Sequence, residues 1–264
     1  MKIAKNIFFF FKVLCGSPAL RKLFRRLKAL FWYLKDLRAY KKQQKTCNNL
    51  FPVNLYYPCL LDKTDSSGSV GGHYFWQDLL VARKIYANKP QKHVDIGSQI
   101  AGFIAHVCVF REIEVFDIRP LNSNIKNVKF TQADLMADDF SLNNYTDSVS
   151  CLHTIEHMGL GRYGDKIDVN GHLKCLANIY KMLLLGGQFY FSVPIGKQCT
   201  AFNAHRIFSL DYLLNIFKDQ YNIQSFSYVD DKGDFFENAE LTLENVNTSF
   251  NCLYGCGIFE LIKK

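Results

Sequence analysis

Three carboxylates follow three successive apolar stretches of the sequence, in an order that suits a nucleotide site. Asp95 and Gly97 follow the first stretch, and Asp117 closes the second, twenty residues beyond Gly97. An acid at that spacing can accept hydrogen bonds from both hydroxyls of a ribose. Asp134 follows the third stretch, where it can reach the exocyclic amine of an adenine. Each signal is weak alone, but their common order indicates one ligand crevice.

Two histidines and a glutamate follow the fourth apolar stretch. Imidazoles titrate near neutral pH, so His153 or His157 can remove a proton from a hydroxyl group. We predict that His153 points into the crevice, because it closes the stretch, and we assign His153 and Glu156 as the candidate catalytic pair. The alternative is that both histidines only order the loop that follows.

Residues 159–165 form a glycine-rich segment that suits a mobile loop over a ligand. Within it, Arg162 can hold a phosphate or carboxylate with its forked donors, and Tyr163 can lie against a sugar ring. The alternative is an ordered loop with a surface salt bridge. Three further substrate candidates follow the fifth apolar stretch: Asn203, His205 and Arg206.

The elements that must position these residues alternate between strands and helices. Strands are predicted at 94–96, 113–116, 128–132, 148–152, 188–193, 223–228 and 257–262, and helices at 74–86, 103–110, 171–185 and 209–219. This alternation predicts a doubly wound, Rossmann-like α/β fold with a mainly parallel sheet. We expect the domain to cover residues 73–264, after a connector at 46–72.

The turn after the first strand carries one departure from a typical cofactor site. Gly97 permits a tight turn, and Gly102 lets the next helix approach the sheet. Between them stands Gln99, where a second small residue is usual. Its side chain either crowds a ligand, turns aside or hydrogen-bonds the ligand.

Residues 1–45 form a basic arm that differs from the rest of the chain. They hold thirteen Lys and Arg against Asp36 alone, a charge of +12, which leaves the other 219 residues at about −4 of the total +8. Pro18 begins a predicted amphipathic helix with leucines at three- and four-residue spacing. Such a helix suits an anionic membrane surface; packing on the domain or on a partner is the alternative.

The composition excludes several classes of function. A mildly acidic body disfavours nucleic-acid binding. The apolar run at 7–14 is about half the length of a membrane span. The nine cysteines form no CxxC pair and no compact His/Cys cluster, and Cys252 and Cys256 lack a second ligand pair. We therefore expect reduced thiols, no metal site and a cytoplasmic protein, either free or peripheral on the inner face of a membrane.

The motifs together resemble class I S-adenosylmethionine-dependent methyltransferases over residues 73–262. The resemblance implies S-adenosyl-L-methionine as cofactor, bound by Asp95, Gly97, Ser98, Gln99, Asp117 and Asp134. Residues 150–157 look like the fourth-strand motif, and 182–189 like the turn into the fifth strand. More narrowly, residues 94–121, 153–165 and 203–206 are similar to DUF268, a family of methyltransferase-like proteins associated with cell-surface polysaccharide.

The resemblance implies an O-methyltransferase that acts on a sugar or glycan intermediate, such as a nucleotide-linked or lipid-linked sugar, in cell-surface polysaccharide biosynthesis. The alternative from another class is a non-catalytic Rossmann-like protein that binds a glycan or scaffolds enzymes at the membrane, which Gln99 favours. A nicotinamide-dependent enzyme is a third reading, disfavoured because the required glycine spacing is absent.

Overall fold

The computed structural model describes residues 18–47, 51–65, 67–68 and 70–264. The chain divides into two units, residues 1–69 and residues 70–264. The apolar run at 7–14 lies outside the described residues.

The first unit contains the predicted basic helix, α2 (Pro18–Gln44), and a short 3₁₀ turn, η1 (Asp62–Thr64). Residues before and within η1 contact α2 at several positions, among them Tyr56, which contacts Lys41. Lys63 pairs with Asp36 at 2.8 Å and lies over the ring of Trp32, and Ala29 is buried. No helix in the described ranges is long and apolar enough to cross a membrane.

The second unit is built on an eight-stranded sheet in the order β3-β2-β1-β4-β5-β10-β8-β9. The first five of these strands are parallel, and β10 runs antiparallel to both of its neighbours. Their bounds are β1 His93–Ile96, β2 Ile113–Asp117, β3 Val128–Gln132, β4 Thr146–Leu152, β5 Leu183–Ile195, β8 Tyr221–Val229, β9 Phe235–Phe236 and β10 Gly255–Lys263. The strand order reverses between β1 and β4, as the doubly wound fold requires.

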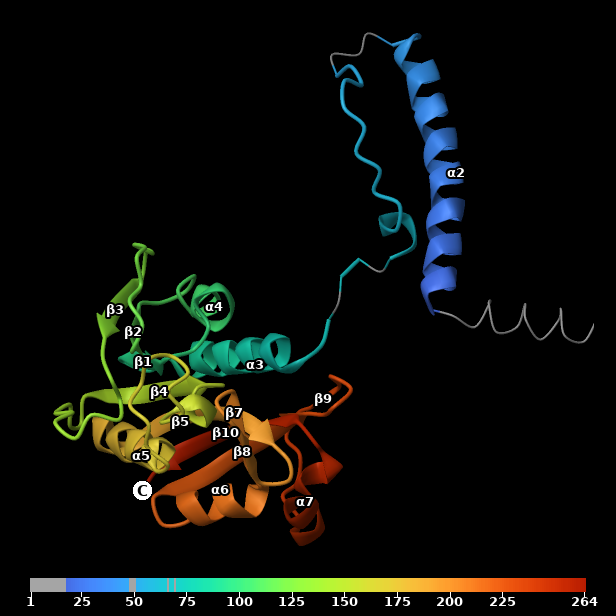
Figure 1. Cartoon of the computed structure of the whole chain (residues 1–264). Helices are drawn as coiled ribbons and strands as arrows, with labels where there is room; N and C mark the ends of the chain where they lie inside the picture. The colour runs from blue at the N-terminus through green and yellow to red at the C-terminus, as the bar shows by residue number, and fades with distance from the viewer. Residues whose placement is uncertain (1–17, 48–50, 66, 69) are drawn as a thin grey trace, which may run out of the picture. The chain divides into compact units, whose positions relative to one another are not determined.

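Helices cover both faces of this sheet (Figure 1). One face carries α3 (His73–Asn88), the π-helical turn η2 (Ile100–Ile104) and α4 (Ala105–Val107), and the other carries α5 (Gly171–Met182) and α6 (Leu210–Phe217). Each face has its own buried apolar cluster, one against α5 and α6 and the other against α3 and α4. The shorter elements are η3 (Ile155–His157), the hairpin β6–β7 (Cys199–Ala201 and His205–Ile207), α7 (Leu243–Thr248) and η4 (Ser249–Asn251).

The predicted fold class is confirmed, and each of the seven predicted strands is present. The predicted bounds of two helices were wrong. The helix predicted at 171–185 ends at Met182, because Leu183 is already extended and pairs with Thr146 of β4. The helix predicted at 103–110 begins earlier as a π-helical turn at Ile100 and ends at Val107.

Candidate functional site

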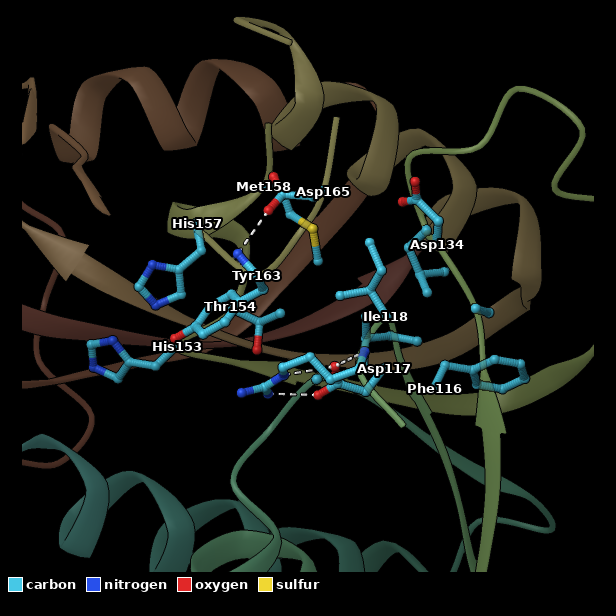
Figure 2. Close-up of a pocket in the computed structure, with 15 residues that line it drawn as sticks. Phe116, Asp117, Ile118, Asp134, His153, Thr154, His157, Met158, Tyr163 and Asp165 are labelled. Carbon is cyan, nitrogen blue, oxygen red and sulfur yellow. Dashed lines mark hydrogen bonds and ion pairs between the residues drawn. The ribbon is translucent and has the colours of Figure 1, made fainter. Parts of the chain in front are cut away.

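An open pocket lies at the carboxyl ends of β1, β2, β3 and β4, beside the point where strand order reverses. Its empty volume is about 530 Å³. Figure 2 shows His153 and His157 at one end, Phe116 and Asp134 at the other, and Asp117 between them. The complete lining is Ile96, Gly97, Phe116, Asp117, Ile118, Arg119, Ala133, Asp134, Leu135, His153, Thr154, His157, Met158, Tyr163 and Asp165.

Asp95 and Ser98 hold the turn after β1 together. The buried Asp95 carboxylate accepts hydrogen bonds from the Ser98 amide at 2.9 Å, the Ser98 hydroxyl at 2.6 Å and the Ser150 hydroxyl at 2.5 Å. Burial raises the pKa of Asp95 to about 7, although these hydrogen bonds oppose the rise. Neither side chain lines the pocket, so the structure shows them supporting the turn.

Gly97 lines the pocket, whereas Gln99 does not. Gly97 has a φ of +67°, and a Cβ there would lie 2.6 Å from the Thr154 methyl group. Gln99 is exposed and immediately precedes η2, and its carboxamide oxygen would lie 3.2 Å from a Cβ at Gly102. The structure therefore does not place the Gln99 side chain among the residues that line this pocket.

Asp117, the last residue of β2, forms a forked ion pair with Arg119. The guanidinium donates to the two carboxylate oxygens at 3.0 and 2.7 Å, and the Arg119 amide donates at 2.8 Å. Arg119 also lies 4.4 Å from the centre of the Tyr163 ring. The carboxylate is mostly buried and the guanidinium half-exposed, so the carboxylate is fixed while the cation can move aside.

Asp134 follows β3 and lines the opposite end of the pocket from the histidines (Figure 2). Its Oδ1 accepts the Met136 amide at 2.8 Å, which orients the carboxylate. The apolar side chains of Phe116, Ile118 and Leu135 line the pocket around it. An apolar slot with one oriented acceptor can hold a flat heterocycle that bears an amine.

His153 directly follows β4 and forms a buried pair with Glu156, from Nδ1 to Oε1 at 2.7 Å. Burial alone would lower the pKa of His153, but Cys256 and Glu156 outweigh it and raise this pKa to about 10. Its ring stacks on the ring of His73, with centroids 5.1 Å apart. His153 thus touches the pocket, but its ring is engaged by groups on other elements.

His157 lies at the same end of the pocket with a defined proton position. Its Nδ1 is 2.7 Å from the carbonyl oxygen of Ala204, which can only accept a hydrogen bond. The proton therefore sits on Nδ1, and Nε2 carries the lone pair. Burial lowers the pKa of His157, with Glu156 opposing. At neutral pH this ring is uncharged and can accept a proton.

The loop at 159–165 is ordered by one buried acid. Asp165 accepts the amides of Gly159 at 2.8 Å, Gly161 at 3.0 Å and Tyr163 at 3.1 Å. Arg162 donates to the carbonyl of Ala204 at 2.9 Å. These contacts correspond to the ordered-loop alternative more than to a mobile cover, and they place Tyr163 at the pocket wall.

The structure does not bring the three predicted residues after β5 into the pocket. Arg206 is buried and donates to the carbonyl oxygens of Met158 at 2.6 Å and Val169 at 3.4 Å. His205 packs against the ring of Tyr254, and Asn203 is exposed in the β6–β7 turn. Arg206 holds loops in place because a buried guanidinium needs acceptors for its donors.

The prediction from sequence missed Arg119, which lines the pocket, and the His73 and Cys256 side chains beside His153. Arg119 stands two residues after the acid of β2, a position that could have been read as a partner for that acid. His73 and Cys256 are 80 and 103 residues from His153 in sequence, so no local spacing connects the three.

Comparison with solved structures shows the same fold in the [4+2]-cyclase SpnF, with a TM-score of 0.51 and 12% identity over 81% of this chain and 85% of that one. The N-methyltransferase NodS from Bradyrhizobium japonicum WM9, in complex with S-adenosyl-L-homocysteine, is 11% identical over 78% and 91%, with a TM-score of 0.49. A 1,6-didemethyltoxoflavin-N1-methyltransferase from Burkholderia thailandensis is 13% identical over 71% and 78%, with a TM-score of 0.48. At 12% identity, the likeness to SpnF shows the fold alone, and a fold does not fix a reaction.

The sequence of the chain matches no curated protein. It does match one protein family, described as "Caenorhabditis protein of unknown function, DUF268", over residues 112–251, which is more than half of the chain and spans β2 to η4. The chain therefore belongs to the DUF268 family.

Proposed function

We propose that the pocket binds S-adenosyl-L-methionine and that the protein transfers its methyl group to a hydroxyl of a sugar or glycan intermediate. The observation that carries this proposal is the placement of Asp117 and Asp134 on one open pocket, at the ends of adjacent strands. The sequence resemblance to class I methyltransferases adds the cofactor's identity. The absence of Gln99 from the pocket lining supports the proposal, because this side chain does not fill the space beside Asp117 and Asp134.

The residues present fit this cofactor. The Asp117 carboxylate would accept hydrogen bonds from the two ribose hydroxyls. The apolar slot beside Asp134 would hold the adenine, and Asp134 would accept a hydrogen bond from the adenine amine. Gly97 has no side chain at the turn, so the cofactor could approach the backbone there. When bound, the cofactor supplies an electrophilic methyl group.

His157 is the residue best placed to take the proton of an acceptor hydroxyl. Its Nε2 is 3.7 Å from Oε1 of Glu156, so the carboxylate would stabilise the imidazolium that forms. The sequence pointed to His153 for this role, but the His153 ring is engaged by Glu156 and stacked on His73. In our proposal His157 is the base and Glu156 its partner.

Two side chains support the sugar acceptor, Tyr163 at the pocket wall and Arg162 outside the pocket's lining. Tyr163 offers a ring face for a sugar, and the exposed Arg162 offers donors for the phosphate of a nucleotide-linked or lipid-linked sugar. The polysaccharide setting itself comes from the sequence resemblance to DUF268.

Methyl transfer from labelled S-adenosyl-L-methionine tests this function directly. The full chain would be incubated with a panel of nucleotide sugars and lipid-linked sugars, and labelled products would be separated. We expect at least one methylated sugar, lost in Asp117→Ala and retained in Asp211→Ala, an exposed acid on α6. Cofactor binding without transfer to any sugar would contradict the activity and favour the scaffold alternative.

We also propose that α2 holds the protein at an anionic membrane surface. Lys63 contacts the stripe with Trp32 and Asp36, where Ala29 is also buried. By helical spacing the leucine stripe is on the opposite side, and Leu27 is 54% and Phe31 77% exposed. Basic residues on the same helix, among them Arg26, Lys28 and Lys35, would meet anionic headgroups.

A further inference from the structure

Three potential metal ligands from three distant elements meet beside the pocket. His73 begins α3, His153 follows β4, and Cys256 is the second residue of β10. One ligand atom from each lies within 4.8 Å of both others. Cys256 is fully buried and His153 is 7% exposed, while His73 is half-buried. We call these three residues the HHC cluster.

One nitrogen in the HHC cluster is buried without a partner. His153 Nε2 makes no hydrogen bond among the described residues, whereas Nδ1 is held by Glu156 at 2.7 Å. Burying an imidazole nitrogen without a hydrogen bond is costly, and such atoms are rare unless a ligand or water satisfies them. Nε2 is therefore the atom of this ring that can bind an ion, and binding releases the proton it carries.

Glu156 gives the HHC cluster a second feature of metal sites. Histidines that bind metals commonly donate their other ring N–H to a carboxylate, which fixes the tautomer and raises the basicity of the ligand nitrogen. The Glu156 carboxylate is 1% exposed and makes this contact with His153. Its second oxygen, Oε2, is also buried and has no hydrogen-bond partner in the part of the chain that the structure describes.

We propose that His73, His153 and Cys256 bind a Zn²⁺ ion, with Glu156 orienting His153. Two imidazoles and a thiolate are ligands that Zn²⁺ prefers, and three protein ligands leave a fourth position open. The charges also balance, because the ion meets the Cys256 thiolate and the Glu156 carboxylate in a buried place. Among the three ligands, only His153 also lines the pocket, so the proposed ion would lie next to it.

Ion binding requires one local movement. The His73 and His153 rings are 8° from parallel, with centroids 5.1 Å apart, and an ion must lie near the plane of each imidazole that binds it. The half-buried His73 follows two glycines with positive φ, Gly71 and Gly72. We therefore expect the His73 ring, rather than the buried His153 ring, to turn toward the ion.

Titration of the full chain with Co²⁺ tests the site, because a thiolate bound to Co²⁺ gives a near-ultraviolet charge-transfer band. We expect one equivalent of Co²⁺ to produce this band with the visible bands of a four-coordinate ion, and Zn²⁺ to displace it. Cys256→Ser abolishes the charge-transfer band, and His73→Asn weakens binding. Glu156→Gln weakens Co²⁺ binding about 10- to 100-fold, as for other carboxylate partners of metal-binding histidines.

Matched controls separate this site from other thiols and from the proposed cofactor pocket. Cys252→Ser changes another buried cysteine, four residues away, and Asp117→Ala changes the pocket; both should keep the band. Circular dichroism shows which variants are folded, and His73→Asn tests the site even if Cys256→Ser unfolds. A folded wild-type protein without the band, or a band that survives both Cys256→Ser and His73→Asn, would overturn the proposal.

Discussion

Arg119 forms an ion pair with the Asp117 carboxylate, which would bind the ribose of the proposed cofactor. A ribose at Asp117 must displace the guanidinium, which is half-exposed, so little binding energy should be lost. Exposed ion pairs contribute up to about 1 kcal/mol, or about fivefold in affinity. We expect Arg119→Ala to bind S-adenosyl-L-homocysteine up to about fivefold more tightly than the wild type. Calorimetry measures the change, and tenfold weaker binding would instead make Arg119 a cofactor ligand.

The proposed base makes methyl transfer sensitive to pH. Burial lowers the pKa of His157 below its usual value of 6.5, so the ring stays neutral at pH 7 and gains a proton only in more acidic solution. We expect kcat to be constant above about pH 7.5, where even an unperturbed histidine is mostly neutral, and to fall in acidic solution with an apparent pKa below 6.5. His157→Gln should lose most activity and this pH dependence.

The matched control is His106→Gln, which changes an exposed histidine on α4. Its pH profile should follow the wild type. If His157→Gln keeps both the rate and the acidic limb of the profile, His157 is not the base.

At the scale of single residues, sequence predicts the acids better than their surroundings. Asp117 and Asp134 could be placed because each closes an apolar strand, and parallel strands end at one edge of a sheet. The orientation of the Gln99 side chain could not be predicted, because it depends on the π-helical turn at Ile100. The HHC cluster could not be predicted either, because its residues come together only in the folded sheet. There β10 lies beside β5, which is the neighbour of β4.

At the scale of elements, the turn between β1 and η2 depends on Gly97. Gly97 and Gly186 both have positive φ, but only at Gly97 would a Cβ meet a neighbour, the Thr154 methyl group. A non-glycine residue in this conformation costs about 1–2 kcal/mol. We expect Gly186→Ala to lose about that much stability, and Gly97→Ala about 3–4 kcal/mol because Thr154 must also move. Equal losses in urea unfolding would contradict this packing.

The leucine stripe of α2 makes a prediction about membrane binding. The full chain should sediment with vesicles that contain phosphatidylserine, less so at high salt because the headgroup attraction is screened. Leu27→Glu with Phe31→Glu should abolish sedimentation. The control is Leu55→Glu, which changes an 88% exposed leucine outside α2. If the α2 variant still binds vesicles, α2 does not mediate membrane binding.

At the scale of the whole molecule, buried histidines should make the fold sensitive to acid. Burial lowers the pKa of His93 to about 3 and that of His172 to about 4. The unfolded chain therefore binds more protons than the folded one between pH 6.5 and these values, and stability falls as pH decreases through this window. Asp95 acts in the opposite sense, because its raised pKa favours the folded state at lower pH.

A single variant isolates one of these contributions. His93 is fully buried between the hydroxyls of Ser148 and Ser150. His93→Gln should lose less unfolding free energy than the wild type on acidification from pH 6.5 to pH 4, measured by urea unfolding. His106→Gln, an exposed change, should match the wild type. An unchanged slope in His93→Gln would show that His93 is not responsible.

The fold as a whole was the most predictable feature of this protein. The seven strands and the mainly parallel sheet could be inferred because the hydrophobic period of each element and the residues of the turns are local signals. Residues of the site could be predicted only where they lie at the end of a strand, as Asp117 does. Arg206 shows the limit, because a buried cation that binds Met158 and Val169 carbonyls looks in sequence like a substrate ligand.

Calorimetric titration of the full chain with S-adenosyl-L-homocysteine tests the central claim most directly. We expect one site per chain, with binding at least about tenfold weaker in Asp117→Ala, since a hydrogen bond to a charged group contributes about 1.5–3 kcal/mol. Asp211→Ala, a change outside the pocket, should bind like the wild type. The absence of binding at millimolar ligand, with the protein folded, would contradict a methyltransferase cofactor site.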